Sequence, residues 1–248
     1  DQRGAGRTFE KLGPATPDLT LERQVDDGVD LARQLRKRFP KNDLIVLGHS
    51  WGSVIATGMV QKQPALFDAY VGTGQVATWA AGVQWQFDFL KERARANNDA
   101  AALASLEAIG KPDPRNIVQY FTFSRPLRSH MNDSDKAWFA NMKAIAARGG
   151  ATETDIETAG KGMDFSGGKL IQTMIREDLV STAPRFETRY CVIQGEHDLS
   201  TPTAPAKAYF DIVTAPKKRY AVIEGAGHFA LATHQAAFIA AMKTCIGQ

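Results

Sequence analysis

Short apolar runs alternate along this chain with longer stretches in which apolar residues recur at helical spacing. The runs are too short for helices and are bounded by turn residues, which is typical of strands buried on both faces of a parallel sheet. These predicted strands cover residues 44–47, 69–71, 190–194 and 220–223. The helical periodicity predicts helices over residues 20–39, 52–63, 204–213 and 230–246. The alternation indicates an α/β fold, with a mostly parallel sheet and helices on both faces.

One long segment interrupts this alternation. Residues 78–186 contain helix-like patterns separated by Gly, Pro and Asn-Asp turns, and no strand stands out among them. The predicted helices there cover residues 79–96, 100–109, 115–123, 135–147 and 169–180. We therefore expect a core made of residues 1–77 and 187–248, with a helical cap inserted over residues 78–186. The opening residues, DQRGAGRT, are polar and glycine-rich and are predicted to form a loop.

The first candidate for chemistry is Ser50, in the sequence Gly48-His49-Ser50-Trp51-Gly52. This G-x-S-x-G pattern is weak as a string, but here a predicted strand precedes it and a predicted helix follows it, as a nucleophile on a sharp turn requires. Such a turn strains the serine backbone, so small flanking residues are needed, and we expect Gly48 and Gly52 to supply them. The backbone N–H of Trp51 is the expected donor to an oxyanion. The alternative is an ordinary serine in a βα loop.

A serine nucleophile needs a base and a group that orients the base. His228 directly follows the predicted strand 220–223, at the sheet edge where active sites assemble, so it is the favoured base. Asp198 and Glu196 both follow the strand 190–194, and we choose Asp198 because it lies deeper in the loop. Glu224 is a weaker rival. The order Ser50, Asp198, His228 is the one expected for an α/β-hydrolase.

The composition narrows the function classes. The chain has 248 residues, of which 44% are hydrophobic and 23% are charged, with a net charge of +3. No apolar run approaches the roughly 20 residues that span a membrane, so no membrane span is expected. The densest basic groups, at residues 33–38 and 217–219, are predicted to be solvated faces rather than a nucleic-acid-binding patch. Neither zinc-type cysteine spacing nor a phosphate loop is present, and we expect no metal or organic cofactor.

Four motifs together resemble a known family. DQRGAGRT, GHSWGS, GEHDLSTP and GAGHF look like the corresponding motifs of the proline iminopeptidases, the α/β-hydrolases of peptidase family S33. The resemblance implies an α/β-hydrolase fold in which Ser50 is the nucleophile, Asp198 the orienting acid and His228 the base. It also implies a serine hydrolase that releases N-terminal residues from short peptides through an acyl-enzyme.

The chain departs from this family at its start. The family carries a His-Gly-Gly-type loop before the DQRG loop, whereas this sequence begins at Asp1. The resemblance therefore implies that the N-terminal strands and a second oxyanion donor belong to a remainder of the same polypeptide; the alternative is a genuinely shortened protein. A sheet cut at this point would expose a long unpaired edge.

The cap also departs from the family. Proline iminopeptidases bind the substrate's free amine with cap carboxylates, typically with a Trp-Glu pair, but Trp79, Trp85 and Trp138 are followed here by Ala, Gln and Phe. A charged loop offers other carboxylates, namely Glu153, Asp155, Glu157 and Asp164. The many cap aromatics predict an apolar pocket above the nucleophile. A carboxylesterase acting on small acyl or aromatic esters therefore stays open, and a non-catalytic binding module is the remote alternative.

The two cysteines, Cys191 and Cys245, should meet at the edge of the sheet away from the active site. They form either a disulfide, which would imply a periplasmic or secreted protein, or a pair of buried thiols in a cytoplasmic one.

Overall fold

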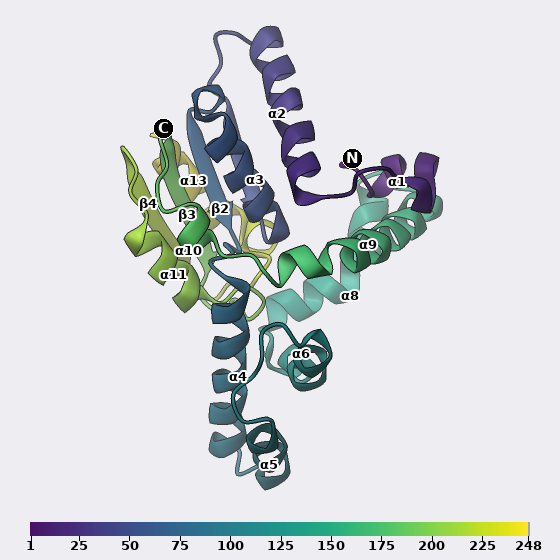
Figure 1. Ribbon diagram of the computed structural model, residues 1–248, viewed down its shortest axis with the longest axis vertical. Coiled ribbons are helices and arrows are strands. Elements are labelled where there is room, and N and C mark those ends of the chain that lie inside the picture. The colour runs from purple at the N-terminus through teal and green to yellow at the C-terminus, as the bar shows by residue number, and fades with distance from the viewer. Residues whose placement is uncertain (248) are drawn as a thin grey trace.

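A computed structural model describes residues 1–247 and contains one four-stranded parallel sheet (Figure 1). Its strands are β1 (Ile45–His49), β2 (Ala69–Thr73), β3 (Arg189–Gly195) and β4 (Lys218–Ile223), in the spatial order β1-β2-β3-β4. All three pairings are parallel, so the carboxyl ends of the four strands lie at one edge. The predicted parallel sheet and its four strands are confirmed.

Helices cover both faces of this sheet. On one face, α3 (Trp51–Lys62) and α11 (Thr203–Ile212) pack on the strands, and α2 (Leu21–Arg38) and α10 (Leu179–Thr182) pack on these two helices. Their apolar residues form one cluster with Tyr70, Tyr190 and Val192 of the strands. On the other face, α12 (Ala230–Thr233) and α13 (Gln235–Ile246) pack on Val71 and Ile193. The predicted last helix, residues 230–246, is thus two helices joined at His234. A short 3₁₀ helix, η2 (Pro64–Leu66), links α3 to β2.

Strand β1 differs from the expected strand buried on both faces. Every residue of β2 is buried, but β1 is largely half-buried and Leu47 is 41% exposed. The reason is its place at the edge of the sheet, where it pairs with β2 alone among the described residues. That a further strand from the same polypeptide pairs with β1 stays a prediction.

The chain opens with a helix, so the prediction of a loop over residues 1–8 is wrong in part. Helix α1 (Gly6–Leu12) begins inside it and continues into η1 (Gly13–Ala15). The Asp1 carboxylate accepts a hydrogen bond of 2.8 Å from the Arg7 N–H at the start of this helix. Phe9 packs on Phe165 with ring centroids 5.3 Å apart, so α1 lies against α9 (Glu153–Met174) rather than the sheet (Figure 1).

Seven helices occupy the segment between β2 and β3, and six of them precede α10. These six are α4 (Trp79–Ala96), α5 (Ala100–Ile109), α6 (Ile117–Ser124), α7 (Leu127–His130), α8 (Asp133–Arg148) and α9 (Glu153–Met174). The first four share their own apolar cluster, which includes Phe87, Leu90 and Phe123. Among the helices of residues 1–247, none has both the length and the apolar character that crossing a bilayer requires.

Helix α9 corrects two expectations. The acidic residues 153–164 form its first half rather than a charged loop, and the helix ends at Met174 instead of continuing toward residue 180. A capping box starts it: the Thr152 hydroxyl accepts from the Asp155 N–H, and the Asp155 carboxylate accepts from the Thr152 N–H.

The two cysteines meet as expected, and the structure holds them as free thiols. Both are buried, and the Cys191 Sγ lies 3.4 Å from the Cys245 carbonyl oxygen. The arrangement matches the alternative of two adjacent buried thiols.

Candidate active site

Ser50 occupies the turn between β1 and α3. Its backbone has φ 54° and ψ −126°, a region that residues with a side chain rarely adopt. The turn is held because the Ser50 N–H donates to Thr73 O at 3.0 Å and the Ser50 carbonyl accepts from the Ser53 N–H at 2.8 Å. Sequence reasoning therefore anticipated both the turn and its strain.

Of the two glycines around Ser50, only one is required by the described structure. A Cβ at Gly48 would lie 2.5 Å from Gly52 O and 2.7 Å from Ser53 Cα, so no larger residue fits. A Cβ at Gly52 would meet no described atom within 4 Å. The expectation that both glycines are needed for space holds for Gly48 alone.

Trp51 is the first residue of α3, and its N–H has no carbonyl one turn earlier in the helix to bond. It is therefore a free donor beside the Ser50 side chain, at the positive end of a helix of 12 residues. The indole lies against α2, where its Nε1 is 3.4 Å from the Gln24 Oε1.

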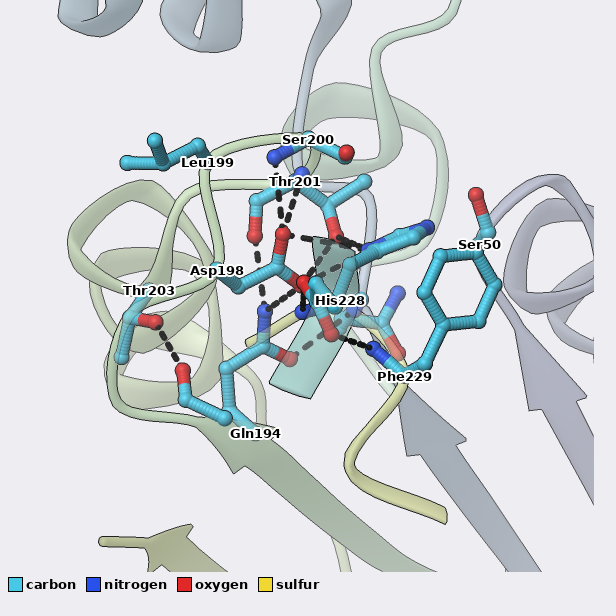
Figure 2. Close-up of polar contacts among 12 residues, drawn as sticks. Ser50, Gln194, Asp198, Leu199, Ser200, Thr201, Thr203, His228 and Phe229 are labelled. Carbon is cyan, nitrogen blue, oxygen red and sulfur yellow. Dashed lines mark hydrogen bonds and ion pairs between the residues drawn. The ribbon is translucent and has the colours of Figure 1, made fainter. Parts of the chain in front are cut away.

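Asp198 lies in the loop after β3 and is 2% exposed. Its Oδ1 accepts from the Ser200 and Thr201 N–H groups at 2.9 and 2.8 Å. Its Oδ2 accepts from the Thr201 hydroxyl at 2.9 Å and from the Gln194 amide at 3.1 Å. The same oxygen lies 2.9 Å from His228 Nδ1, so the carboxylate orients the imidazole (Figure 2).

The rival carboxylates lie elsewhere. Glu196 is exposed and accepts from the Gly225 N–H, and Glu224 is exposed on the loop before His228. Of the three carboxylates weighed from the sequence, Asp198 alone bonds the imidazole.

His228 follows β4 in the loop before α12 and is 6% exposed. Burial tends to lower the pKa of its imidazole. The charges of Asp198 and Asp135, and the hydrogen bond that the Asp198 carboxylate accepts, outweigh burial, so the pKa lies above its ordinary value. The hydrogen bond at Nδ1 leaves Nε2 as the nitrogen available for proton transfer.

Ser50 and His228 flank the end of β2. Ser50 N bonds Thr73, and a Cβ at the next residue, Gly74, would lie 2.9 Å from His228 Cε1. No hydrogen bond joins the Ser50 hydroxyl to any described residue, and none is drawn to it in Figure 2.

The other histidine of the motif, His49, packs on the base. Its ring centroid lies 4.6 Å from that of His228 and 5.5 Å from that of Phe229. Burial, and secondarily the nearby His228, lower the pKa of His49 to about 4, so its ring is neutral at pH 7. Neither ring nitrogen has a hydrogen-bond partner among residues 1–247. His49 therefore acts as a packing partner for His228 at neutral pH.

A cavity of about 140 Å³ opens beside Ser50 and is lined by residues of the loops at the carboxyl ends of the strands and of the helices between β2 and β3. Its apolar wall includes Val76, Trp79 and Val83, with Tyr120 also present. Glu177, between α9 and α10, is the one carboxylate in the cavity wall formed by the described residues. Burial raises the pKa of Glu177, and the charges of Glu22 and Asp178 raise it further.

The acidic residues weighed from the sequence lie away from this cavity. Glu153, Asp155, Glu157 and Asp164 all belong to α9 and do not line it. Asp155 caps the helix and pairs with Arg7, and Glu157 pairs with Lys161. Glu177 was missed because no motif in the sequence marks it; in the structure it lies next to the Thr78–Asp178 bridge, which joins the two ends of the segment between β2 and β3.

The geometry supports nucleophilic chemistry at a carbonyl group: a serine on a strained turn, a histidine oriented by a buried carboxylate, and a free N–H at a helix start. No group of three or more His, Cys, Asp or Glu side chains in residues 1–247 could hold a metal ion.

A family model for the α/β-hydrolase fold matches residues 1–235. The chain belongs to the α/β-hydrolase fold family. The predicted fold class is thereby confirmed at the level of the family as well as the sheet.

Relatives of this α/β-hydrolase include an aminopeptidase by name. Probable aminopeptidase YbaC from Bacillus subtilis (strain 168) is 24% identical over 234 residues, which are 92% of this chain and 72% of that protein. The proline iminopeptidase-related protein of Thermus thermophilus matches with a TM-score of 0.61 at 18% identity, over 100% of this chain and 77% of that one. A thermophilic esterase from Thermogutta terrifontis matches with a TM-score of 0.53 at 14% identity, over 91% and 71% of the two chains. At these identities the solved structures support the fold alone.

Proposed function

We propose that this α/β-hydrolase is a serine hydrolase that releases the N-terminal residue of short peptides. The arrangement of Ser50, His228 and Asp198 supports a serine hydrolase. Glu177 is the observation that favours a substrate with a free amine. A relative named as an aminopeptidase, at 24% identity, supports the same choice.

In this mechanism, the Ser50 Oγ attacks the carbonyl carbon of the scissile amide while His228 Nε2 removes its proton. Asp198 holds Nδ1–H and stabilises the imidazolium that forms. The Trp51 N–H donates to the oxyanion. His228 then gives the proton to the leaving amine, and water, activated by the same histidine, releases the free amino acid from the acyl-enzyme.

The argument for an amine rests on charge. Glu177 is half-buried beside an apolar wall and near the charges of Glu22 and Asp178, so its carboxylate is costly to ionise without a cation beside it. A protonated α-amine of a peptide would compensate that charge and fix the first residue with its carbonyl near Ser50. A charge-assisted hydrogen bond of this kind contributes about 1.5–3 kcal/mol.

A carboxylesterase is the second candidate, and the apolar wall favours it. Val76, Trp79 and Val83 would accommodate an acyl or aromatic group without help from Glu177.

A fluorophosphonate probe tests the nucleophile directly. We expect it to label Ser50, and Ser50→Ala to abolish both labelling and turnover. Failure of labelling together with unchanged ligand binding by Ser50→Ala would instead favour a non-catalytic binding module.

A substrate panel then separates peptidase from esterase. We expect prolyl- or alanyl-p-nitroanilide with a free amine to be cleaved at least about 100-fold better, in kcat/KM, than its N-acetylated form. Glu177→Gln should lower kcat/KM for the free-amine substrate by about 10- to 100-fold and leave p-nitrophenyl butyrate hydrolysis unchanged. Glu187→Gln, an exposed glutamate outside the cavity, is the matched control. Hydrolysis of the ester alone would select the carboxylesterase.

A further inference from the structure

We propose that cap helix α8 positions the histidine of the active site, through Asp135 and Asn132, which bind the backbone of the loop that carries His228. The proposal rests on the proposed function, because it assigns to His228 the role of base. It adds a positioning residue that the triad motifs do not contain.

Asp135 is the centre of this contact. It lies in the first turn of α8, and it is 2% exposed. Its Oδ2 accepts from the His228 N–H at 2.6 Å, and its Oδ1 accepts from the Phe229 N–H at 3.2 Å. One buried carboxylate of the cap therefore fixes two successive peptide groups of the core, 93 residues away in the sequence.

Asn132 adds a third bond from the same helix end. Its side-chain amide donates to Gly225 O at 2.8 Å, while its Oδ1 accepts from the Asp135 N–H at 3.0 Å. Asn132, the N-cap of α8, thus bonds both its own helix and the loop that carries His228. Residues 225–229 are held at both ends, by Asn132 at Gly225 and by Asp135 at His228 and Phe229.

The sequence of the loop is adapted to this contact. A Cβ at Gly227 would lie 2.1 Å from the Asp135 Oδ2 and 2.8 Å from the Asn132 Oδ1, so any side chain there would displace the helix end. The second glycine of the GAGHF motif is therefore explained by the approach of α8.

The next turn of α8 continues the same face. Trp138 stacks on Phe229 with ring centroids 5.7 Å apart, and Phe139 meets the same ring edge-on at 5.1 Å. Asn132, Asp135 and Trp138 follow one another at intervals of three residues, so they share one side of the helix. Polar and apolar contacts thus act on adjacent residues of one loop.

Asp135 also acts on His228 by its charge. The titratable groups nearest the imidazole are Asp198 from the loop after β3, His49 from β1 and Asp135 from α8, which bonds the His228 backbone. Glu196 instead accepts from the Gly225 N–H and lies 3.6 Å from His197 Nε2. Both aspartates raise the pKa of His228, Asp198 more strongly than Asp135. Asp135 therefore has two separable effects, one on the position of the His228 imidazole and one on its pKa.

Kinetics of three variants separate these effects, using whichever anilide or ester the wild-type enzyme hydrolyses. Asp135→Asn keeps the shape but removes the charge and turns one donor–acceptor contact into two facing donors. We expect kcat to fall by about 10- to 100-fold with KM nearly unchanged, as for a small misplacement of a reacting group. We also expect the acidic limb of kcat/KM against pH to move to lower pH, because a base with a lowered pKa stays neutral in more acidic solution.

Asn132→Ala keeps the Asp135 charge, so it should lower kcat without moving the limb. Asp133→Asn, one of the most exposed acids of the same helix turn, should change neither.

The outcomes are distinguishable from failure of the proposed function. An inactive wild type that the fluorophosphonate does not label would refute the proposed function before any variant is compared. An active wild type with unchanged kcat and an unmoved limb in Asp135→Asn would overturn the positioning role. Asp135→Ser is prepared alongside as a second neutral variant. If neither neutral variant folds while Asp133→Asn does, Asp135 is a structural residue and the positioning role is rejected.

Discussion

The polar side chains of two loops at the carboxyl edge of the sheet differ in their hydrogen bonding. The Asp198 carboxylate, after β3, accepts four hydrogen bonds from its own loop and strand and also faces His228. The Ser50 hydroxyl, after β1, has no partner among the described residues, and its backbone is strained at φ 54°. In the proposed mechanism, the group that orients the base is therefore fixed by hydrogen bonds to its carboxylate, whereas the nucleophile is positioned by its backbone and its hydroxyl stays unbonded.

Ser50→Gly should give the largest effect, because it removes the hydroxyl and relieves the backbone strain at the same time. Removing the hydroxyl should lower kcat/KM by at least about 10⁴-fold. Because glycine adopts φ 54° without strain, the free energy of unfolding should rise by about 1–2 kcal/mol. The measurements are turnover and urea unfolding of wild type and variant.

Asn98→Gly is the matched control for strain. Asn98 also has φ 54°, but it is exposed in the cap, so its replacement should leave activity unchanged. Asparagine tolerates a positive φ better than serine, and the expected gain in stability is smaller. A Ser50→Gly protein no more stable than wild type would contradict the idea of a strained turn.

Asp198→Asn tests the hydrogen bonds that the Asp198 carboxylate accepts, and it should have the next largest effect. The amide cannot hold the imidazole in the required tautomer, so kcat should fall by about 10³- to 10⁴-fold. Unlike Ser50→Gly, this variant should also be less stable, by about 1–3 kcal/mol, because its NH₂ group would face backbone donors or leave them unpaired. Urea unfolding beside the kinetics measures both.

Glu196→Gln, two residues earlier in the same loop, provides the control, since that side chain is exposed. Loss of activity without loss of stability in Asp198→Asn would mean that the hydrogen bonds around Asp198 contribute little to the fold.

The same contrast explains what could be predicted from the sequence. Ser50, Asp198 and His228 each follow a strand that periodicity reveals, and the carboxyl ends of parallel strands must meet, so local pattern and topology sufficed. Asp135 and Glu177 belong to the cap, where helices pack by contacts that leave no spacing rule behind. Their roles depend on which helix end reaches which loop, and that is fixed only by tertiary packing.

Helix α9 shows a local failure of the same kind. Its glycines, among them Gly160, Gly162 and Gly167, weaken the helix signal, and the acidic residues from Glu153 to Asp164 were expected to lie in a charged loop. Yet Thr152 and Asp155 stand at the spacing of a capping box, which could have marked the start of the helix. Gly162 is explained by packing, because a Cβ there would lie 3.1 Å from Gly4 O.

His49 offers a third test, through stability against pH. Its pKa is about 4 in the folded protein and 6.5 ordinarily, so between these values the unfolded chain binds a proton that the folded protein does not. Stability should therefore be lost as pH falls from about 6.5 toward 4, by at most about 3 kcal/mol from this residue. His49→Phe, which keeps an aromatic ring against His228, should lose less stability over that range. Urea unfolding at pH 7 and pH 5 measures the difference, and a parallel loss in both proteins would contradict the buried neutral ring.

The pair of cysteines should give the smallest effect, because it lies at the opposite edge of the sheet from Ser50. Hydrogen bonding to Cys245 and burial raise the pKa of the Cys191 thiol, so it stays protonated and unreactive at neutral pH. Cys245→Ala should change kcat/KM by less than about twofold and lower stability by about 1 kcal/mol, as for removal of a small buried side chain. Maleimide should label the native protein slowly and label two cysteines in urea without reductant. An intact mass two units lower, with no labelling in urea until a reductant is added, would show that Cys191 and Cys245 form a disulfide in solution.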